Sequence, residues 1–325
     1  MLFDRVYRLL VGKKGQSQGL EISELRIQFD IEKTAKKNPN KSSIKIYNLV
    51  KSTREELEKP DTRCLLYAGY KDGDGALLLF SGSVTFAWSK FELPDIVTEL
   101  ELGDGAAEIR DTTISVGYGK NVKSTQILND VAKKMGVALT LPSDAPERAW
   151  ENGLSYYGSA RTLLDKVTKG TGLEWSIQNG NLQVIKAGMV TTRQGIVLSS
   201  DSGLIGSPER ERKAKEGTAE VKDSKKKKQT VKTAAKHYDG WSVKTLLLPQ
   251  LNPGDRVKLE SRDVNGVFRI QEIKHSGDSH GGDWQSEMKL IDPALPLTDD
   301  KSTGGRTSRG RGVLDDDDSD EPLEM

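Results

Sequence analysis

The sequence predicts a mainly β protein with a small α/β module inserted between two β regions. Three observations favour this organisation. Apolar and polar residues alternate over the first hundred residues and again after about residue 190, which is the pattern of half-buried strands. Between these regions, over residues 120–186, the apolar spacing changes to that of amphipathic helices. Turn sequences rich in Gly, Asn, Asp and Pro separate the short segments.

Four parts follow one another along the chain in this prediction. We expect a first β domain over residues 1–118, an α/β insert module over 119–188, a second β domain over 189–296 and a polar, acidic tail over 297–325. The second β domain includes a lysine-rich segment, 208–238, whose low apolar content predicts a solvated, mobile loop. The tail has no hydrophobic periodicity, and we expect it to be disordered in isolation.

The first β domain contains a clear strand pattern in ELRIQFDIE. Its apolar residues alternate with polar ones and are Leu25, Ile27, Phe29 and Ile31. Ser52 with Glu55 forms a capping-box pattern, which predicts a short helix over 52–59 that ends before Pro60. Two further strands are predicted on either side of the Gly- and Asp-rich turn sequence at 71–75.

The insert module is predicted to contain two amphipathic helices followed by a hairpin. The first helix begins at Ser124 as its N-cap and ends at Gly136. Its apolar face consists of Ile127, Leu128, Val131 and Met135. A second helix repeats the pattern with Leu163, Leu164 and Val167. Asn179-Gly180 lies between two alternating segments and predicts a hairpin turn.

Strand patterns return in the second β domain, where two turn sequences stand out. The NPGD sequence at 252–255 has Pro and Gly at the two central positions, as a type II turn requires. Asn265-Gly266 predicts a second hairpin turn. We therefore expect a series of short antiparallel strands from residue 240 to residue 292.

Composition excludes several classes of protein. The net charge is +1 over 325 residues, so the total charge does not point to nucleic acid or to a membrane surface. Cys64 is the lone cysteine, which rules out an internal disulfide and cysteine-rich zinc sites. No stretch approaches the roughly 18 apolar residues of a membrane span, and the apolar run at the N-terminus is too short for a signal peptide. We expect a protein made in a reducing cytoplasm.

One cluster invites a reading as a metal or catalytic site. Four polar residues fall within nine positions: His275, Asp278, His280 and Asp283. A metal site would need three or four converging ligands, and the spacing of the two histidines fits neither one helix face nor one strand face. The alternative is an antiparallel hairpin whose loop, SGDSHGG, carries Gly, Asp and Ser because turns require them. We favour the hairpin.

Other candidate sites have simpler explanations. Lys225–Lys228 could bind phosphate backbones, but acidic residues lie nearby and aromatic residues do not, so we favour a solvated loop. The glycines in Gly69–Gly75 lack the following helix of a phosphate-binding loop. Asp315–Asp318 lacks the spaced ligands of a calcium loop, and we interpret it as part of a charged interaction tail. We predict no catalytic, cofactor-binding or metal-binding residues, and therefore no enzyme.

Three stretches resemble one family of proteins, the baseplate hubs of contractile-tailed phages. SSIKIYNLVKSTREELEK with LLYAGYKDGDGALLLFSGSV is similar to the first tube-type domain of these hubs. STQILNDVAKKMGV with YYGSARTLLDKVTKGTGLEWSIQNGNLQVI resembles the α/β module that interrupts them. The stretch from LLLPQLNPGDRVKLES to HSGDSHGGDWQSEMKLID is similar to their closing segment. The resemblance covers roughly residues 1–295, in the correct order, but not the lysine-rich segment or the acidic tail.

The resemblance implies a structural role. Hubs of this family are homotrimers in which two tube-like β domains per chain adapt the sixfold tail tube to the threefold central spike. Implied partners are the tail tube protein, the central spike protein, and other baseplate and tape-measure proteins. DNA would only pass through the lumen, and no membrane binding is implied. The protein would assemble in the host cytoplasm and reside in the virion tail baseplate. Two alternatives are a peptidoglycan hydrolase of the injection apparatus, with chemistry in the 275–283 loop, and a tail-tube protein.

Overall fold

The structure is a computed structural model that describes residues 4–13, 19–35, 40–59, 62–191, 193, 195–222 and 228–293. For Lys41, Ala106 and residues 212–239, it describes the backbone at most. Strands predominate among these residues, and helices are few and short. The predicted fold class, mainly β with an α/β insert, is confirmed. The predicted acidic tail, 297–325, lies outside the described residues.

The first β region runs from β1 to β7 and contains one helix, α1. Its elements are β1 (Arg5–Lys13), β2 (Leu20–Ile22), β3 (Ile27–Thr34), β4 (Lys41–Tyr47), α1 (Lys51–Leu57), β5 (Thr62–Tyr70), β6 (Gly75–Glu92) and β7 (Asp95–Gly103). The alternation predicted for β3 is confirmed, since Ile27, Phe29 and Ile31 are buried while Asp30 and Glu32 are exposed.

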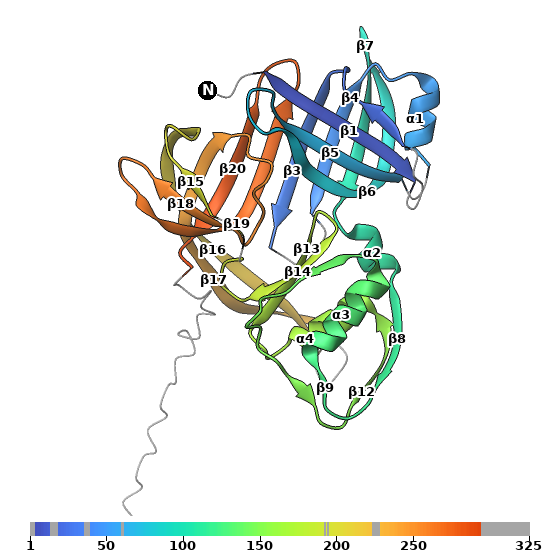
Figure 1. The fold of residues 1–325 in the computed structure, drawn as a ribbon, viewed down its shortest axis with the longest axis vertical. Coiled ribbons are helices and arrows are strands. Elements are labelled where there is room, and N and C mark those ends of the chain that lie inside the picture. The colour runs from blue at the N-terminus through green and yellow to red at the C-terminus, as the bar shows by residue number, and fades with distance from the viewer. Residues whose placement is uncertain are drawn as a thin grey trace, which may run out of the picture. The chain divides into compact units, whose positions relative to one another are not determined.

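The inserted α/β region follows. Its elements are α2 (Ala106–Asp111), β8 (Thr113–Tyr118), β9 (Val122–Lys123), α3 (Ser124–Met135), β10 (Ala138–Thr140), β11 (Ala149–Trp150), β12 (Leu154–Ser159), α4 (Ala160–Thr168), β13 (Leu173–Gln178) and β14 (Asn181–Lys186). Both predicted amphipathic helices are present, and their predicted apolar faces are buried. Figure 1 shows α3 and α4 beside the strands of this region.

The last β region completes the described chain. Its elements are β15 (Ile196–Leu198), β16 (Leu204–Lys222), β17 (Lys228–Leu246), β18 (Arg256–Glu260), β19 (Asn265–Asp278) and β20 (Trp284–Ile291). The segment predicted as a mobile loop, 208–238, is instead largely strand, because β16 and β17 extend through it as hydrogen-bonded neighbours. Residues 223–227, which include most of the lysine run, lie outside the described residues.

Antiparallel pairing between β3 and β19 joins the two β regions into one sheet (Figure 1). The register places Thr34 opposite Glu272 and Gln28 opposite Asp278. The main path of this 13-stranded sheet is β16-β17-β20-β19-β3-β4-β7-β6-β5-β1-β2, and β18 and β15 branch from β19. β3 therefore has a partner on both sides, which removes an open edge from the first β region.

Three hydrophobic clusters form the core of the described chain. One is centred on β1 and β3 to β7 and also includes Trp284 from β20. The second is formed by the inserted region around α3 and α4. The third lies beneath β17 to β20 and includes Val257 and Met288. Each region therefore buries apolar side chains of its own, while Trp284 links the last strand to the first cluster.

Local turn signals predicted two chain reversals correctly. Asn179 and Gly180 have φ angles of 53° and 73° and connect β13 to β14, as a type I′ turn requires. Gly254 has a φ of 91°, and the N–H of Asp255 donates to the carbonyl of Asn252, as expected for the type II turn. Gly136 ends α3 in the left-handed conformation, as predicted.

Both predicted serine caps are wrong. Helix α1 begins at Lys51, with Val50 as its N-cap and no side-chain cap. Its start is set by tertiary contacts, because Asn48 exchanges hydrogen bonds with Asp95 and Ile96 of β7. Helix α3 begins at Ser124 itself, and the Ser124 hydroxyl accepts the N–H of Arg148, which lies just before β11.

The second predicted hairpin turn is misplaced by three residues. Asn265 and Gly266 lie within β19, opposite Glu260 and Leu259 of β18. The reversal occurs at 261–264, where the N–H of Ser261 donates to the carbonyl of Val264. The Ser261 hydroxyl in turn accepts the N–H of Val264, so a serine side chain supplies the turn that the Asn-Gly pair was expected to form.

Candidate functional site

The cluster of histidines and aspartates lies at the junction between β19 and β20. His275 belongs to β19 and is fully buried, whereas His280 lies in the exposed loop 279–283. The structure therefore does not bring the two imidazoles together, in agreement with the spacing argument. Among the residues that the structure describes, no group of three or more His, Cys, Asp or Glu side chains could hold a metal ion.

His275 is a buried, neutral core residue. Its Nδ1 lies 2.8 Å from the hydroxyl of Ser286, which is opposite it in β20. Burial, reinforced by the charge of Lys33, lowers the pKa of His275 well below its ordinary value. An imidazole that stays neutral and is sealed from solvent is suited to packing and not to exchanging protons with a substrate.

Asp278 is the centre of an ionic contact with the first β region. Its carboxylate accepts hydrogen bonds from Arg26 at 3.2 Å and 2.6 Å, and from the amide of Gln28 at 2.8 Å. The backbone N–H of His280 donates to the same carboxylate at 2.9 Å. Burial alone would raise the pKa of Asp278, but these hydrogen bonds outweigh it and lower the pKa to about 2.

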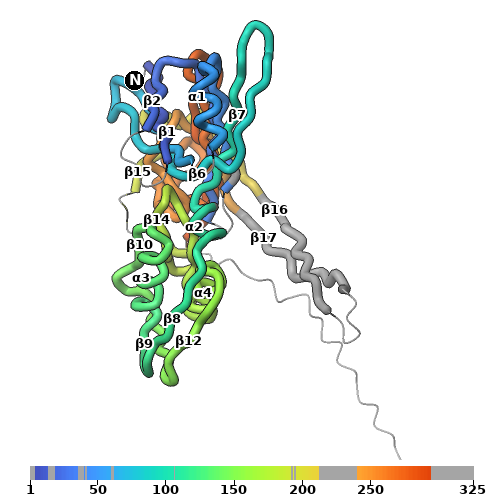
Figure 2. Tube along the Cα trace, turned by 90° about the vertical axis from the view of Figure 1, so that its right-hand side faces the viewer, coloured from blue at the N-terminus to red at the C-terminus, as the bar shows by residue number. Residues whose placement is uncertain are grey.

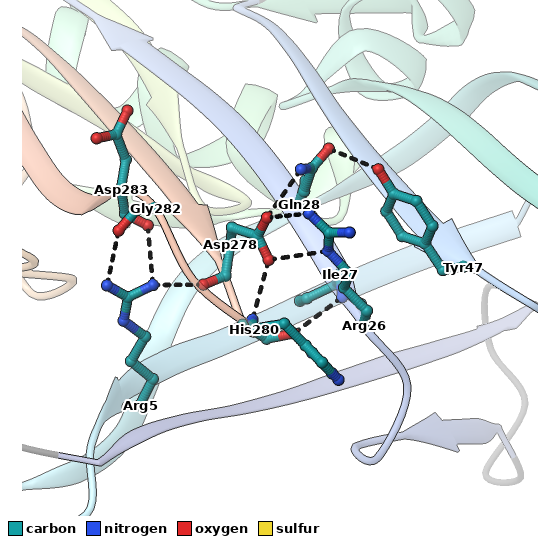
Figure 3. Close-up of polar contacts among 10 residues, drawn as sticks. Arg5, Arg26, Ile27, Gln28, Tyr47, Asp278, His280, Gly282 and Asp283 are labelled. Atoms are coloured by element: carbon teal, nitrogen blue, oxygen red, sulfur yellow. Dashed lines mark hydrogen bonds and ion pairs between the residues drawn. The ribbon is translucent and has the colours of Figure 1, made fainter. Parts of the chain in front are cut away.

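Hydrogen bonds from the first β region also fix the backbone of the 278–283 loop (Figure 3). Arg5 of β1 donates to the carbonyls of Asp278 and Gly282, each at 2.7 Å. Ser279 exchanges two hydrogen bonds with Ile27, since its N–H donates to the Ile27 carbonyl and its hydroxyl accepts the Ile27 N–H, both at 3.0 Å. Two arginines and one strand end from the N-terminal region thus fix the 278–283 loop.

Trp284 anchors the same junction from the inside. Its indole N–H donates to the carbonyl of Gly69 at 3.2 Å, and its ring meets Phe29 edge-to-face at 5.2 Å. Gly277 lies against these two rings, and a Cβ there would be 2.3 Å from the Phe29 ring. A glycine is therefore required at position 277, and the GD-x-HG-x-DW sequence is accounted for by packing and hydrogen bonding.

A second polar cluster, which the sequence did not predict, lies where the inserted region meets the sheet. Lys33 of β3 is fully buried, and its ammonium donates to the amide oxygen of Asn252 at 2.8 Å. Burial lowers the pKa of Lys33 to about 8, although Asp104 and Asp255 oppose this shift. The burial of Lys33 could not be predicted from the sequence, because the stretch IEKT has the alternation of an ordinary half-buried strand.

Asp104 fastens the inserted hairpin to the end of β7. Its carboxylate accepts the backbone N–H groups of Asn179, at 2.6 Å, and Gly180, at 3.2 Å. Burial raises the pKa of Asp104 to about 7, because the loss of water outweighs these two hydrogen bonds. The Asn-Gly turn was predictable from the sequence, but its role as a docking point was not.

Polar contacts continue around this junction. The amide of Gln178 donates to the carbonyl of Thr34 at 2.7 Å, and that of Gln183 donates to the carbonyl of Pro253 at 3.0 Å. Arg269, which is fully buried in β19, pairs with Glu174 of β13. The inserted region is thus attached to both β regions through buried hydrogen bonds and ion pairs.

One face of the joined sheet is polar across β19, β3, β4 and β7. A hollow of about 550 Å³ on this face is lined by both strand and loop residues. Its charged lining residues are Asp30, Glu32, Glu99, Glu101 and Lys274. The opposite faces of these strands supply the buried apolar side chains, so the alternation of each strand creates an acidic surface over an apolar core.

None of the helices in the described part of the chain has the length and apolar character that crossing a bilayer requires.

A family model described as "Baseplate hub gp41" matches residues 10–217, which is more than half of the chain. The chain therefore belongs to this family of phage baseplate hubs. No curated protein matches the sequence significantly.

Solved structures of phage tail proteins share the fold. The 43 kDa tail protein of prophage MuSo2 from Shewanella oneidensis has a TM-score of 0.59 at 13% identity, with 90% of this chain and 99% of that chain covered. A tail protein from Neisseria meningitidis MC58 has a TM-score of 0.60 at 13% identity, with 90% and 98% covered. A component of the type VI secretion system of E. coli has a TM-score of 0.51 at 11% identity, with 89% and 77% covered.

Proposed function

We propose that this hub protein forms a homotrimeric ring that adapts the sixfold tail tube to the threefold central spike. Each chain would contribute two tube-like β domains, 1–118 and 189–296, with the insert module 119–188 between them. The pairing of β19 with β3 is the observation that supports this proposal most, because it joins the two β regions side by side in one sheet. Three such pairs around an axis would present six similar units.

The acidic sheet face suits the wall of a channel for DNA. Carboxylates on a lumen wall repel the phosphate backbone, so DNA can pass without binding. In this arrangement Asp30, Glu32, Glu99 and Glu101 would face the lumen, and Lys274 would be paired with Asp30, from which it lies 2.9 Å away. The protein would have no catalytic, cofactor or metal site, and its role would be mechanical.

The partners follow from this position in the tail. The ring would contact the tail tube protein on one side and the central spike protein on the other, together with other baseplate and tape-measure proteins. It would assemble in the host cytoplasm and act in the virion baseplate without binding a membrane itself. The structure of the 278–283 loop supports a mechanical role over peptidoglycan hydrolysis, because that loop is committed to contacts within the chain.

Mass photometry of the purified protein tests the proposal. We expect a species of three times the 35.8 kDa chain mass. A species of six times this mass would favour a tail-tube protein, and monomers at every concentration would contradict the trimeric ring. A peptidoglycan zymogram with wild type and His280→Ala addresses the enzymatic alternative. We expect no clearing with either protein, and clearing that the substitution abolishes would show that the loop is catalytic.

A further inference from the structure

The hairpin formed by β6 and β7 carries an exposed apolar tip, defined here as residues 90–95. Figure 2 shows this hairpin extending beyond the neighbouring strands. The side chain of Leu93 is 93% exposed and that of Phe91 is 75% exposed. Phe91 lies opposite Ile96, so the two side chains share a face next to Leu93. Apolar side chains this exposed at the end of a long hairpin are typical of a surface that another molecule covers.

The tip carries more acidic than basic side chains. Its two carboxylates, those of Glu92 and Asp95, are accompanied by one lysine, Lys90. Lys90 is already paired with Glu92 at 2.5 Å. A surface that receives this hairpin should therefore offer apolar side chains flanked by cations. An anionic membrane surface would repel the carboxylates, which disfavours lipid as the occupant.

A surface with this character lies on the last β region of the chain. Val197 of β15, Lys258 of β18 and Val267 of β19 stand side by side in the register of three paired strands, and we call them the valine row. Val197 is 42% exposed and Val267 is 47% exposed, although neighbouring residues such as Val257 are fully buried. Two arginines, Arg256 and Arg262, are exposed on β18 and on the following turn, whereas Lys258 is paired with Glu260 and Asp263 is exposed beside Arg262.

The two surfaces of one chain are separated within the sheet. β19, β3 and β4 lie between the β18 branch and the β7–β6 hairpin in the sheet order. A tip on one side and a receiving row on the other form a heterologous pair of surfaces, which closes into a ring when the rotation between copies permits. We propose that the hairpin tip of one protomer docks on the valine row of the next protomer. This inference rests on the proposed ring and specifies its contact between chains.

Engineered cysteines test the contact. In the variant Leu93→Cys with Val267→Cys, a short bismaleimide should link the protomers into covalent dimers and trimers on a denaturing gel. Either single variant alone should give neither species, and wild type reports the background because Cys64 is fully buried. The matched control pairs Leu93→Cys with Tyr157→Cys, which is 81% exposed on the inserted region and should not be linked. Mixing the two single-cysteine proteins gives the same test if the double variant does not fold.

A charge at the tip supplies an independent readout. Leu93→Asp should weaken self-association on the order of tenfold or more, since hot-spot residues contribute at least that much, while the circular dichroism spectrum shows that the protomer stays folded. Tyr157→Asp should leave self-association unaffected. A stable trimer that Leu93→Asp does not weaken and that the cysteine pair does not link would overturn the tip contact while leaving the ring proposal intact. Monomers under all conditions would overturn both.

Discussion

The carboxylate of Asp278 accepts two hydrogen bonds from the guanidinium of Arg26, although the two residues lie 252 positions apart in the chain. This contact ties the loop after β19 to the segment before β3, at one end of the strand pair that joins the two β regions. The histidine- and aspartate-rich loop therefore has a structural role, and we call the Arg26–Asp278 ion pair the clasp.

Removing the charge of Asp278 should weaken the attachment of the 278–283 loop to the first β region. Asp278→Asn retains the size of the side chain but removes the anion that pairs with Arg26, and we expect a loss of about 1 kcal/mol in the free energy of unfolding, because solvent screens this partly exposed pair. His280→Ala is the matched control in the same loop, because His280 contributes its backbone N–H to the clasp. Urea unfolding measures the free energy of unfolding of both variants and of the wild type. Equal stability of Asp278→Asn and His280→Ala would show that the ion pair contributes nothing.

His275 should make the protein less stable in weak acid. Its folded-state pKa lies well below 6.5, so the unfolded chain binds a proton that the folded chain excludes, and stability falls as pH drops below about 6.5. Asp104 acts in the opposite sense between pH 3.8 and about 7, because burial raises its pKa. The comparison of wild type with His275→Gln isolates the histidine. We expect a shallower loss of stability between pH 6.5 and 5 in the variant, and identical slopes would refute this assignment.

Lys33 should have an effect of the same sign as His275 at alkaline pH. Its pKa is lowered to about 8 in the folded state, so between pH 8 and 10.5 the unfolded chain binds more protons and stability rises with pH. Lys33→Met should abolish this rise. Lys71→Met, in the exposed turn after β5, should retain it. Melting temperatures recorded between pH 8 and 10.5 test this prediction. A wild-type melting temperature that falls steadily above pH 8 would count against a buried lysine with a lowered pKa.

The Asn179-Gly180 turn should tolerate no β-branched side chain. Gly180 has a φ of 73°, and its N–H donates to Asp104, so Gly180→Val strains the backbone at a docking point. We expect a cost of about 1–3 kcal/mol in the free energy of unfolding. Gly281→Val is the control, because a Cβ at Gly281 meets nothing within 4 Å and its φ is not positive. Similar costs for the two substitutions would contradict the turn's role.

Local features of the fold were predictable from the sequence, and contacts between distant segments were not. The alternation in β3, the apolar face of α3 and the Asn179-Gly180 turn depend on residues a few positions apart. The β3–β19 pairing joins segments more than two hundred residues apart, and no local pattern encodes it. The predicted cap at Ser124 failed for a related reason, since its hydroxyl accepts the N–H of Arg148, a residue 24 positions away.

At the candidate site, too, some features were predictable from the sequence and others were not. Spacing disfavoured a metal site shared by His275 and His280, and the structure places one imidazole in the core and the other in an exposed loop. The burial of Lys33 and the contact of Asp104 with the insert depend on how three regions meet, so the sequence gives no sign of them. Resemblance to phage hubs predicted the family, which the match over residues 10–217 confirms.

Electron microscopy of the purified assembly tests the central claim most directly, that two β regions joined through β3 and β19 form the repeating pair of a threefold ring. The account predicts a ring with threefold symmetry, six similar lobes around a central opening, and a β3–β19 pair within every protomer. A ring of six identical subunits, or a reconstruction in which β19 pairs with another strand and leaves β3 open on that side, would contradict it.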